Sequence, residues 1–245
     1  MTTYEFKRWL TYPLLPVILI TVRKNLKYLL NKHRSSTEKF KLLDVGGRKS
    51  PYTIGLNADI TLLDVPQENQ TQEQLNLGFT NNILETVKKN RSNISDIVIQ
   101  DMTKSTLTDA SFDGVVSVEV IEHVEEDTLF VENIAKVVRK GGWVYFTTPN
   151  GDYIKNEGPD KNPDHKRHYT RKQLQQLLEN YFSEVDVHYA VHTGKYRVWG
   201  LKSFNIKRPL LIVRSIFGNF INRVQSKNVK IQSQKTAHLI AIAYK

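Results

Sequence analysis

Short apolar runs alternate with helix-patterned segments along most of the chain from residue 40 onward. Runs of apolar and β-branched residues that are bounded by polar or turn-forming residues predict buried strands. The predicted strands are residues 41–45, 60–64, 97–101, 112–118, 143–148, 185–189 and 237–243. Within residues 185–189, apolar positions alternate with polar ones, which indicates a strand that is buried on one face.

Helical periodicity fills the intervals between these strands. Residues 71–90 are typical of one or two helices, and residues 127–139 form an apolar stripe that ends before Gly141 and Gly142. A capping-box pattern at Thr170 and Gln173 opens a further helix. Strands that alternate with helices predict an α/β fold with a doubly wound, mostly parallel, seven-stranded sheet.

A helical extension, residues 1–39, precedes this domain, which takes up residues 40–245. Its residues 10–22 are almost continuously apolar and are flanked by basic pairs. Thirteen residues are too few to span a bilayer, which takes about 20. The small-x-small cleavage pattern of a signal peptide is not present after them. Two alternatives stay open for residues 9–30: an anchor in the membrane interface, or a helix packed on the core.

A basic, helical insertion at residues 190–235 separates the last predicted strand from the rest. Its strongest helical pattern covers residues 209–225, with Pro209 in the first turn. One face would carry Leu210, Val213, Phe217, Phe220, Ile221 and Val224, and Arg214, Asn219, Asn222 and Arg223 would lie elsewhere. Such a helix can lie on a membrane surface. On this pattern alone, we favour the alternative that its apolar face covers the core or a second copy.

The composition fits a globular protein of 245 residues, since 40% of the residues are apolar and 24% are charged. The formal net charge of +10 is unevenly distributed: residues 1–40 carry +6, residues 41–189 carry −7, and residues 190–245 carry +11 with no acidic residue. Two basic ends indicate an anionic surface as partner, either membrane or nucleic acid. The absence of cysteine excludes disulfides and thiolate metal sites, and fits a cytoplasmic protein.

Candidate chemistry lies where four predicted strands end, which is the edge at which open α/β sheets bind ligands. Gly46 and Gly47 follow the first strand, and glycines there let the backbone approach a ligand closely. Asp64 comes twenty residues after Asp44, a spacing that suits a carboxylate bound to ribose hydroxyls. The remaining candidates are Asp101 and Met102 after the third strand, and Glu119 and His123 after the fourth.

These motifs, with the segments FDGVVSVEVIEHV (112–124), VVRKGGWVYFTTPN (137–150) and HKRHYTRKQLQQLL (165–178), resemble the class I S-adenosylmethionine-dependent methyltransferases of the type 11 group. The resemblance covers residues 40–189 and the last strand. It implies a Rossmann-like methyltransferase fold with S-adenosylmethionine as cofactor. The implied contacts are Gly46, Gly47 and Asp44 on the methionine part, Asp64 on the ribose, Asp101 and Met102 on the adenine, and Glu119 near the sulfonium.

Two departures from the family pattern concern the first loop. Lys49 or Ser50 stands where the family usually has a third glycine. Pro51 also interrupts the short interval before the second strand, so the usual first helix must be short or distorted. These departures leave Asp59 as a competitor of Asp64 for the ribose.

Histidines supply the candidate catalytic groups. An oxygen or nitrogen acceptor needs a base for its proton, and His123, His165 and His168 are the candidates. The last two lie in a polar segment, residues 150–169, that is placed to cover the acceptor. Structural roles in turn and loop are the alternative for all three. Asp164, His165 and His168 have metal-ligand chemistry but lack a further ligand, so we predict no metal site.

We therefore predict methyl transfer to an oxygen or nitrogen of a small-molecule or lipid- or glycan-linked acceptor, at the inner face of a membrane that residues 9–30 and 209–225 would contact. One alternative is an RNA methyltransferase that uses the basic C-terminal region. Nucleic acid is not expected, however, because few aromatic residues accompany the basic ones. A second alternative is a non-catalytic scaffold that binds S-adenosylmethionine. The sequence does not predict the oligomeric state.

Overall fold

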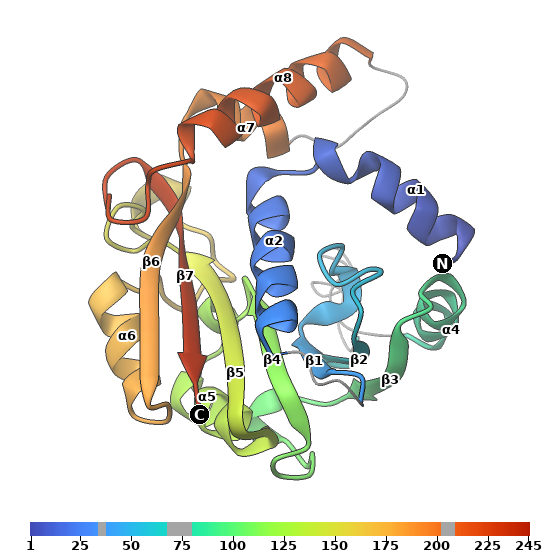
Figure 1. Ribbon diagram of the computed structural model, residues 1–245. Coiled ribbons are helices and arrows are strands. Elements are labelled where there is room, and N and C mark those ends of the chain that lie inside the picture. The colour runs from blue at the N-terminus through green and yellow to red at the C-terminus, as the bar shows by residue number, and fades with distance from the viewer. Residues whose placement is uncertain (34–37, 68–79, 202–208) are drawn as a thin grey trace.

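A seven-stranded sheet forms the centre of the computed structural model, which describes residues 1–33, 38–67, 80–201 and 209–245 (Figure 1). The strands are β1 (Lys41–Val45), β2 (Asp59–Asp64), β3 (Ile94–Ile99), β4 (Phe112–Val118), β5 (Val138–Pro149), β6 (Glu184–His192) and β7 (Thr236–Tyr244). Their order is β3-β2-β1-β4-β5-β7-β6, and β7 is antiparallel to both of its neighbours. The predicted doubly wound, mostly parallel α/β sheet is confirmed.

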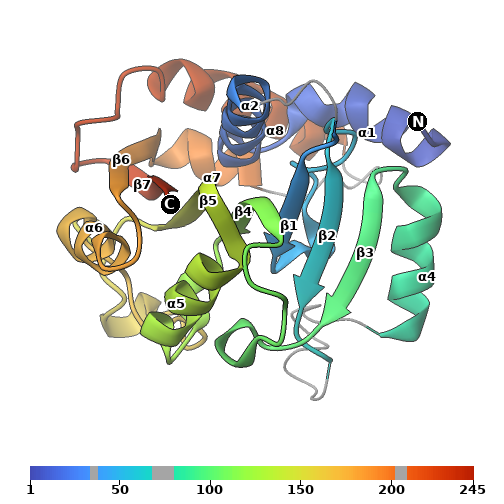
Figure 2. The same ribbon diagram turned by 60° about the horizontal axis from the view of Figure 1, so that its bottom comes forward.

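Helices cover both faces of this sheet, as Figure 2 shows with α2 on one side of β4 and β5 and with α5 and α6 on the other. The helices are α1 (Thr3–Thr11), α2 (Val17–Lys32), α4 (Asn81–Asn90), α5 (Asp127–Val137), α6 (Arg171–Glu179), α7 (Lys195–Leu201) and α8 (Pro209–Gln225). Thr170 and Gln173 form the predicted capping box of α6. Of the predicted helical segment 71–90, residues 71–79 lie outside the described residues.

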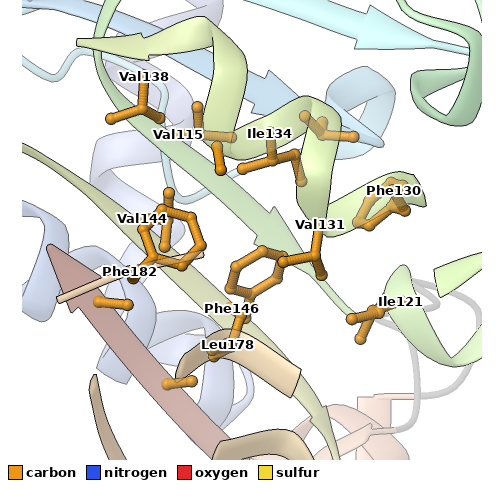
Figure 3. Close-up of a cluster of buried hydrophobic side chains, with 14 of the residues drawn as sticks. Val115, Ile121, Phe130, Val131, Ile134, Val138, Val144, Phe146, Leu178 and Phe182 are labelled. Atoms are coloured by element: carbon orange, nitrogen blue, oxygen red, sulfur yellow. The ribbon is translucent and has the colours of Figure 1, made fainter. Parts of the chain in front are cut away.

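Successive residues of the strands point to opposite faces, so two cores form. Leu43, Val115 and Phe146 face α5 and α6, where Ile134 and Leu178 complete a cluster of buried side chains (Figure 3). The neighbouring residues Leu42, Val116 and Tyr145 face the other way, onto α2. Burial of each large apolar side chain contributes about 1.5–3 kcal/mol, which explains why the central strands are almost entirely apolar.

Helix α2 resolves the two alternatives for most of residues 9–30. Val22 and Leu26 are fully buried, and the Arg23 guanidinium donates hydrogen bonds to the carbonyls of Tyr52, at 3.2 Å, and Ile54. The apolar face of α2 therefore packs on the core, and a membrane anchor over the whole of residues 9–30 is wrong. Trp9 on the preceding helix remains 62% exposed.

Helix α8 contradicts one half of the favoured interpretation, because its apolar face does not cover the core, and the contact with a second copy stays a prediction. The predicted apolar face points outward, with Leu210 84% and Phe220 64% exposed. Its polar residues Ser215, Asn219 and Asn222 point inward and are at most 3% exposed. The reason lies in the surface beneath α8, which presents backbone carbonyls: Asn219 donates to that of Leu14 at 3.0 Å, and Asn222 to that of His192 at 2.6 Å.

Two smaller predictions need correction. Helix α5 ends at Val137, and Gly141 and Gly142 lie within β5 instead of closing the helix. A Cβ atom on Gly142 would lie 2.7 Å from the Asp113 carbonyl oxygen, so the close approach of β4 requires glycine there. Strand β6 alternates as predicted from Glu184 to Val187, but it is buried on both faces from Val187 to Val191. No helix within the described ranges is long and apolar enough to cross a membrane.

Candidate functional site

A tight turn of bare backbone follows β1, as predicted. Gly46 has φ +73°, in the left-handed region, and a Cβ atom there would lie 2.5 Å from Cγ2 of Val120. A Cβ atom on Gly47 would lie 2.7 Å from Cγ of Asp44. The turn is therefore packed against the loop that follows β4, and no larger residue fits at either position.

Asp44 lies under this turn and is fully buried. Its carboxylate accepts hydrogen bonds from the hydroxyls of Ser50, of Thr53 at 2.9 Å and of Tyr52 at 3.3 Å. The buried Arg91 completes the group through Thr53, at 2.8 Å. Burial raises the pKa of Asp44 to about 6, although the hydroxyl donors and the Arg91 charge act to lower it.

These contacts give Asp44 a second role besides the predicted one. Its carboxylate holds the irregular segment from Ser50 to Thr53 in place, where the family pattern would have a regular helix. Its predicted contact with the methionine ammonium group stays a prediction. The local role explains how the turn keeps its shape although Pro51 interrupts the segment.

The ends of β2 and β3 lie side by side. The Gln100 N–H donates to the Asp64 carbonyl at 3.1 Å, so Asp101 follows directly beside Asp64. Asp101 accepts a hydrogen bond from the Thr103 N–H at 2.8 Å. Met102 is 2% exposed. The predicted ribose and adenine residues thus share one edge of the sheet.

Asp59, the competitor of Asp64, lies at the other end of β2. It pairs in register with Lys41, the first residue of β1, and its carboxylate forms an ion pair with Lys39 at 3.2 Å. The amino ends of parallel strands face away from the edge that holds Gly46. Asp59 is therefore excluded from the candidate site, and Asp64 remains.

Glu119 directly follows β4 and has φ +55°, a conformation that costs a residue other than glycine about 1–3 kcal/mol. Its carboxylate accepts a hydrogen bond from the Thr147 hydroxyl at 2.7 Å and lies 3.1 Å from Nδ1 of His238. Burial acts to raise the pKa of Glu119, but His238, Thr147 and the charge of Arg197 outweigh it and lower that pKa. The site thus keeps an ionised carboxylate at this point.

The pKa of Glu122 is shifted in the opposite direction to that of Glu119. Its side chain is 1% exposed and accepts a hydrogen bond from the Thr148 hydroxyl at 3.0 Å. Burial and the nearby charge of Glu119 raise the pKa of Glu122 well above its ordinary value. The pKa values of two neighbouring carboxyl groups are therefore shifted in opposite directions, that of Glu119 downward and that of Glu122 upward.

The three predicted histidines come together beside these carboxyl groups. The ring of His165 packs edge-on against that of His123, with centroids 4.6 Å apart, and its Nδ1 lies 2.7 Å from Nε2 of His168. Nδ1 of His168 in turn lies 2.7 Å from the Ile154 carbonyl oxygen, which can only accept. Burial, together with the charges of His123 and His168, lowers the pKa of His165 to about 4.

The Ile154 carbonyl oxygen can only accept a hydrogen bond, and this fixes where the protons lie on the histidine rings that are hydrogen-bonded to it in series. His168 donates from Nδ1, so its Nε2 accepts from Nδ1 of His165, and the lone pair of His165 is then on Nε2. His123 lies with Nδ1 3.0 Å from the Asp164 carbonyl oxygen, which likewise leaves its lone pair on Nε2. His165 and His123 therefore present basic nitrogens, whereas His168 orients His165.

The same cluster has the composition of a metal site. Ligand atoms of Glu122, His123 and His165 lie within 4.8 Å of one another. This set differs from the one considered from the sequence, because Asp164 contributes its backbone carbonyl to His123. Two imidazoles and a carboxylate suit a divalent transition metal.

Two residues that lower the pKa of Glu119, His238 and Arg197, were not identified from the sequence. His238 of β7 is 4% exposed, and its Nε2 accepts a hydrogen bond from Nη2 of Arg197 in α7 at 3.1 Å. Arg197 belongs to the insertion and does not follow a predicted strand, so the sequence pattern that indicated the other site residues did not include it. The available signal was a single histidine within the otherwise apolar strand TAHLIAIAY, since a buried histidine needs a polar partner.

Comparison with known proteins matches residues 43–146 to the family model described as "Methyltransferase domain". A protein of Mycolicibacterium smegmatis named as a probable S-adenosylmethionine-dependent methyltransferase is 35% identical over 37% of this chain and 36% of its own. Ubiquinone biosynthesis O-methyltransferase of Bartonella quintana is 23% identical over 70% of this chain and 72% of its own. For the first three relatives matched, the chain spans between about a quarter and just over a third of their length.

The fold is also that of solved structures. A SAM-dependent methyltransferase from Archaeoglobus fulgidus superposes with a TM-score of 0.53 at 14% identity, over 91% of this chain and 94% of that one. At this identity the likeness concerns the fold alone. It confirms the Rossmann-like arrangement expected from the sequence.

Proposed function

We propose that this chain, which contains a class I S-adenosylmethionine-dependent methyltransferase domain, transfers a methyl group to an oxygen or nitrogen of a small-molecule or lipid- or glycan-linked acceptor near a membrane surface. One observation carries the proposal. Gly46, Asp64, Asp101 and Glu119 lie at the carboxyl ends of four neighbouring strands, where open α/β sheets bind ligands.

The residues at this edge fit S-adenosylmethionine. Gly46 and Gly47 leave backbone that a Cβ atom would obstruct, so a ligand can lie directly on the turn. Glu119 supplies a negative charge for a cationic ligand, and the Asp64 carboxyl group lies at the strand end where ribose hydroxyls would bind. When bound, the cofactor supplies an activated methyl group, and the protein must orient the acceptor and exclude water.

Removal of the acceptor proton falls to His165 or His123. Both imidazole rings lie in one cluster with the buried Glu122, and the hydrogen bonds of their Nδ1 atoms leave the lone pairs on Nε2. His165 is neutral at physiological pH because its pKa is about 4, so it can accept a proton without first losing one. His168 acts as a positioning residue through its hydrogen bond to His165.

The acceptor class rests on two supports. Several relatives carry the name ubiquinone biosynthesis O-methyltransferase, which indicates that related domains methylate oxygen atoms. In addition, the basic C-terminal helix α8 exposes phenylalanine and leucine side chains. An RNA-binding surface combines basic side chains with aromatic ones on which bases stack, whereas the exposed stripe of α8 also contains the aliphatic residues Leu210, Val213 and Val224, which disfavours the RNA alternative.

The test combines binding with turnover. Calorimetry with S-adenosylhomocysteine is expected to show binding that Asp64→Ala abolishes and that His168→Ala leaves intact. Labelled S-adenosylmethionine, incubated with separated lipid, glycan and RNA fractions, is expected to label the lipid or glycan fraction. Absence of cofactor binding by the folded chain would remove the proposal, and binding without labelling of any fraction would favour the scaffold alternative.

A further inference from the structure

The two stripes of α8 lie on opposite sides of the helix. At 100° per residue, Leu210, Val213, Phe217, Phe220 and Val224 share one face, and Ser215, Asn219 and Asn222 share the face directly opposite. The polar stripe faces the protein, where its amides are hydrogen-bonded to backbone carbonyls. The orientation of α8 is therefore fixed by polar contacts, and its apolar stripe must point away from the protein.

The exposed stripe is large. Val213, Phe217 and Val224 are 64%, 52% and 52% exposed, and Leu210 and Phe220 are more than half exposed as well. Isolated exposed apolar residues are ordinary, but five on one stripe of a helix form a contiguous patch, which marks an interaction surface. No described residue of this chain covers that patch.

Helix α1 extends the exposed apolar surface. Phe6, Trp9 and Leu10 are 49%, 62% and 63% exposed. Figures 1 and 2 both place α1 and α8 along the same upper side of the molecule. The hydrogen bond from Asn219 to Leu14, three residues after α1 ends, joins the two helices. We call the apolar stripe of α8 together with these three residues of α1 the docking face.

Cations surround the docking face. Lys7 and Arg8 are exposed on α1, and Arg214 is exposed on α8, with its guanidinium 4.1 Å from the centre of the Trp199 ring. A groove of about 450 Å³ between α1 and α2 is lined by Trp9 and Leu10 together with Lys24 and Lys27. Apolar side chains bordered by lysine, arginine and tryptophan are typical of helices that lie in a membrane interface.

We propose that the docking face binds the surface of an anionic lipid bilayer. The charge selects this occupant over a second copy of the chain. A symmetric dimer would place the same surface against itself, and the exposed charged residues of α1 and α8 are all basic, namely Lys7, Arg8 and Arg214. Two such surfaces repel each other, whereas anionic headgroups attract each of them. Neither helix crosses the bilayer, so binding is confined to its surface.

The docking face is attached firmly at both ends. The Thr2 hydroxyl donates to the Asn90 carbonyl at 2.5 Å, and Glu5 accepts hydrogen bonds from Ser92, which together hold the start of α1 against α4 and β3. At the other end, Asn219 of α8 donates to the Gly200 carbonyl of α7 at 3.2 Å, and Arg197 of α7 donates to His238, which contacts Glu119. A bilayer bound here would therefore lie in a fixed position relative to the candidate site.

This inference deepens the proposed function, and in that sense rests on it, because a docked chain can reach acceptors held in a lipid surface. Its test measures binding alone. The full chain is floated with vesicles of phosphatidylcholine, and with vesicles in which part of this lipid is replaced by phosphatidylglycerol. We expect flotation with the anionic vesicles and a loss of flotation as salt is added.

A matched pair of double variants tests the surface. Phe217→Glu with Phe220→Glu places two negative charges on the docking face, and is expected to lower vesicle binding by about tenfold or more. Leu129→Glu with Ile231→Glu places the same charges at exposed apolar residues outside it, and is expected to bind as the unchanged chain does. Thermal unfolding confirms that both variants fold.

Three outcomes would overturn the docking proposal: no flotation of the folded chain, equal flotation of both variants, or a dimer that the docking-face variant dissociates without any vesicle binding. Calorimetry with S-adenosylhomocysteine on the same proteins separates this result from the proposed function. Cofactor binding without vesicle binding removes only the docking proposal, and vesicle binding without cofactor binding removes only the methyltransferase proposal.

Discussion

His238 and Glu119, which are 119 positions apart in the sequence, meet with Nδ1 of His238 3.1 Å from Oε2 of Glu119. The contact joins β7 to the end of β4 across β5. Because Arg197 donates to the other ring nitrogen, His238 is held with its proton on Nδ1 and donates it to the carboxylate. The ionised state of Glu119 therefore depends on residues from three distant parts of the chain.

This relationship predicts the effect of two substitutions. Glu119→Gln is expected to weaken S-adenosylhomocysteine binding by about tenfold or more, since a charge-assisted hydrogen bond contributes about 1.5–3 kcal/mol. His238→Ala is expected to weaken it less, because Thr147 still holds the carboxylate. Calorimetry gives both values. Glu125→Gln, at a carboxylate that is 72% exposed, is the control, and equal affinity of Glu119→Gln and the control would refute the role of Glu119.

The turn after β1 can be tested with two glycines of similar conformation. Gly46 and Gly55 have φ +73° and +63°, but a Cβ atom on Gly46 would meet Val120 at 2.5 Å, whereas one on Gly55 meets nothing within 4 Å. Gly55→Ala is expected to cost about 1 kcal/mol of unfolding free energy, and Gly46→Ala about 2–4 kcal/mol. Denaturant unfolding measures both. Gly46→Ala with Val120→Ala should recover part of the difference, and no recovery would exclude the steric cause.

Asp44 is expected to contribute to stability as well as to the site. Asp44→Ala leaves three hydroxyl groups without their acceptor and the buried Arg91 without its counter-charge, which is expected to cost about 3–5 kcal/mol. Asp44→Asn keeps one acceptor oxygen and should cost less. The unfolding free energies of both variants test this. If Asp44→Ala unfolds like the unchanged chain, the carboxylate does not hold residues 50–53.

The lowered pKa of His165 predicts that the unfolding free energy falls as the pH is lowered. Its pKa in the folded chain is about 4, below the ordinary 6.5, so the unfolded chain binds the proton more readily between these values. Its contribution to stability is complete above about pH 6.5 and is lost as the pH falls towards 4. After allowance for solvent screening, we expect a loss of about 1–2 kcal/mol over this range.

Urea unfolding between pH 4 and pH 7 measures this effect, with His165→Asn as the comparison. The substituted chain should lose less stability than the unchanged one as the pH falls. If both chains lose the same unfolding free energy as the pH falls, the pKa of His165 is not lowered by its surroundings. In turnover assays, a neutral His165 also predicts no loss of rate from this group until the pH approaches 4.

The sheet could be predicted from the sequence because buried parallel strands leave a local signal. Leu42 with Leu43 and Val115 with Val116 are apolar on both faces, and each run ends at a glycine or a charged residue. The candidate residues at the strand ends followed from the same pattern. Tertiary contacts to Glu119 did not, because His238 lies inside an apolar strand and Arg197 in a helix of the insertion.

Helix α8 shows the limit of an amphipathic pattern. The sequence correctly placed Phe217 and Phe220 on one face, but the pattern cannot say whether that face meets the protein. Here the neighbouring surface offers the carbonyls of Leu14, His192 and Gly200, which accept hydrogen bonds from the polar side chains of α8 and cannot be satisfied by apolar ones. An unsatisfied buried carbonyl costs more than an exposed phenylalanine gains by burial, so Asn219 and Asn222 face inward.

The family match stops at Phe146, one residue before Thr147, and all three groups that lower the pKa of Glu119 lie beyond that boundary. A shortened protein cut to residues 43–146 would retain the glycine turn and every carboxylate of the candidate site. It would nevertheless lack Thr147, Arg197 and His238, so the Glu119 carboxylate would lose the three side chains that lower its pKa, and β5 would become the edge of the sheet. The segment that matches the family model is thus not a self-sufficient module, and expression trials should keep β7.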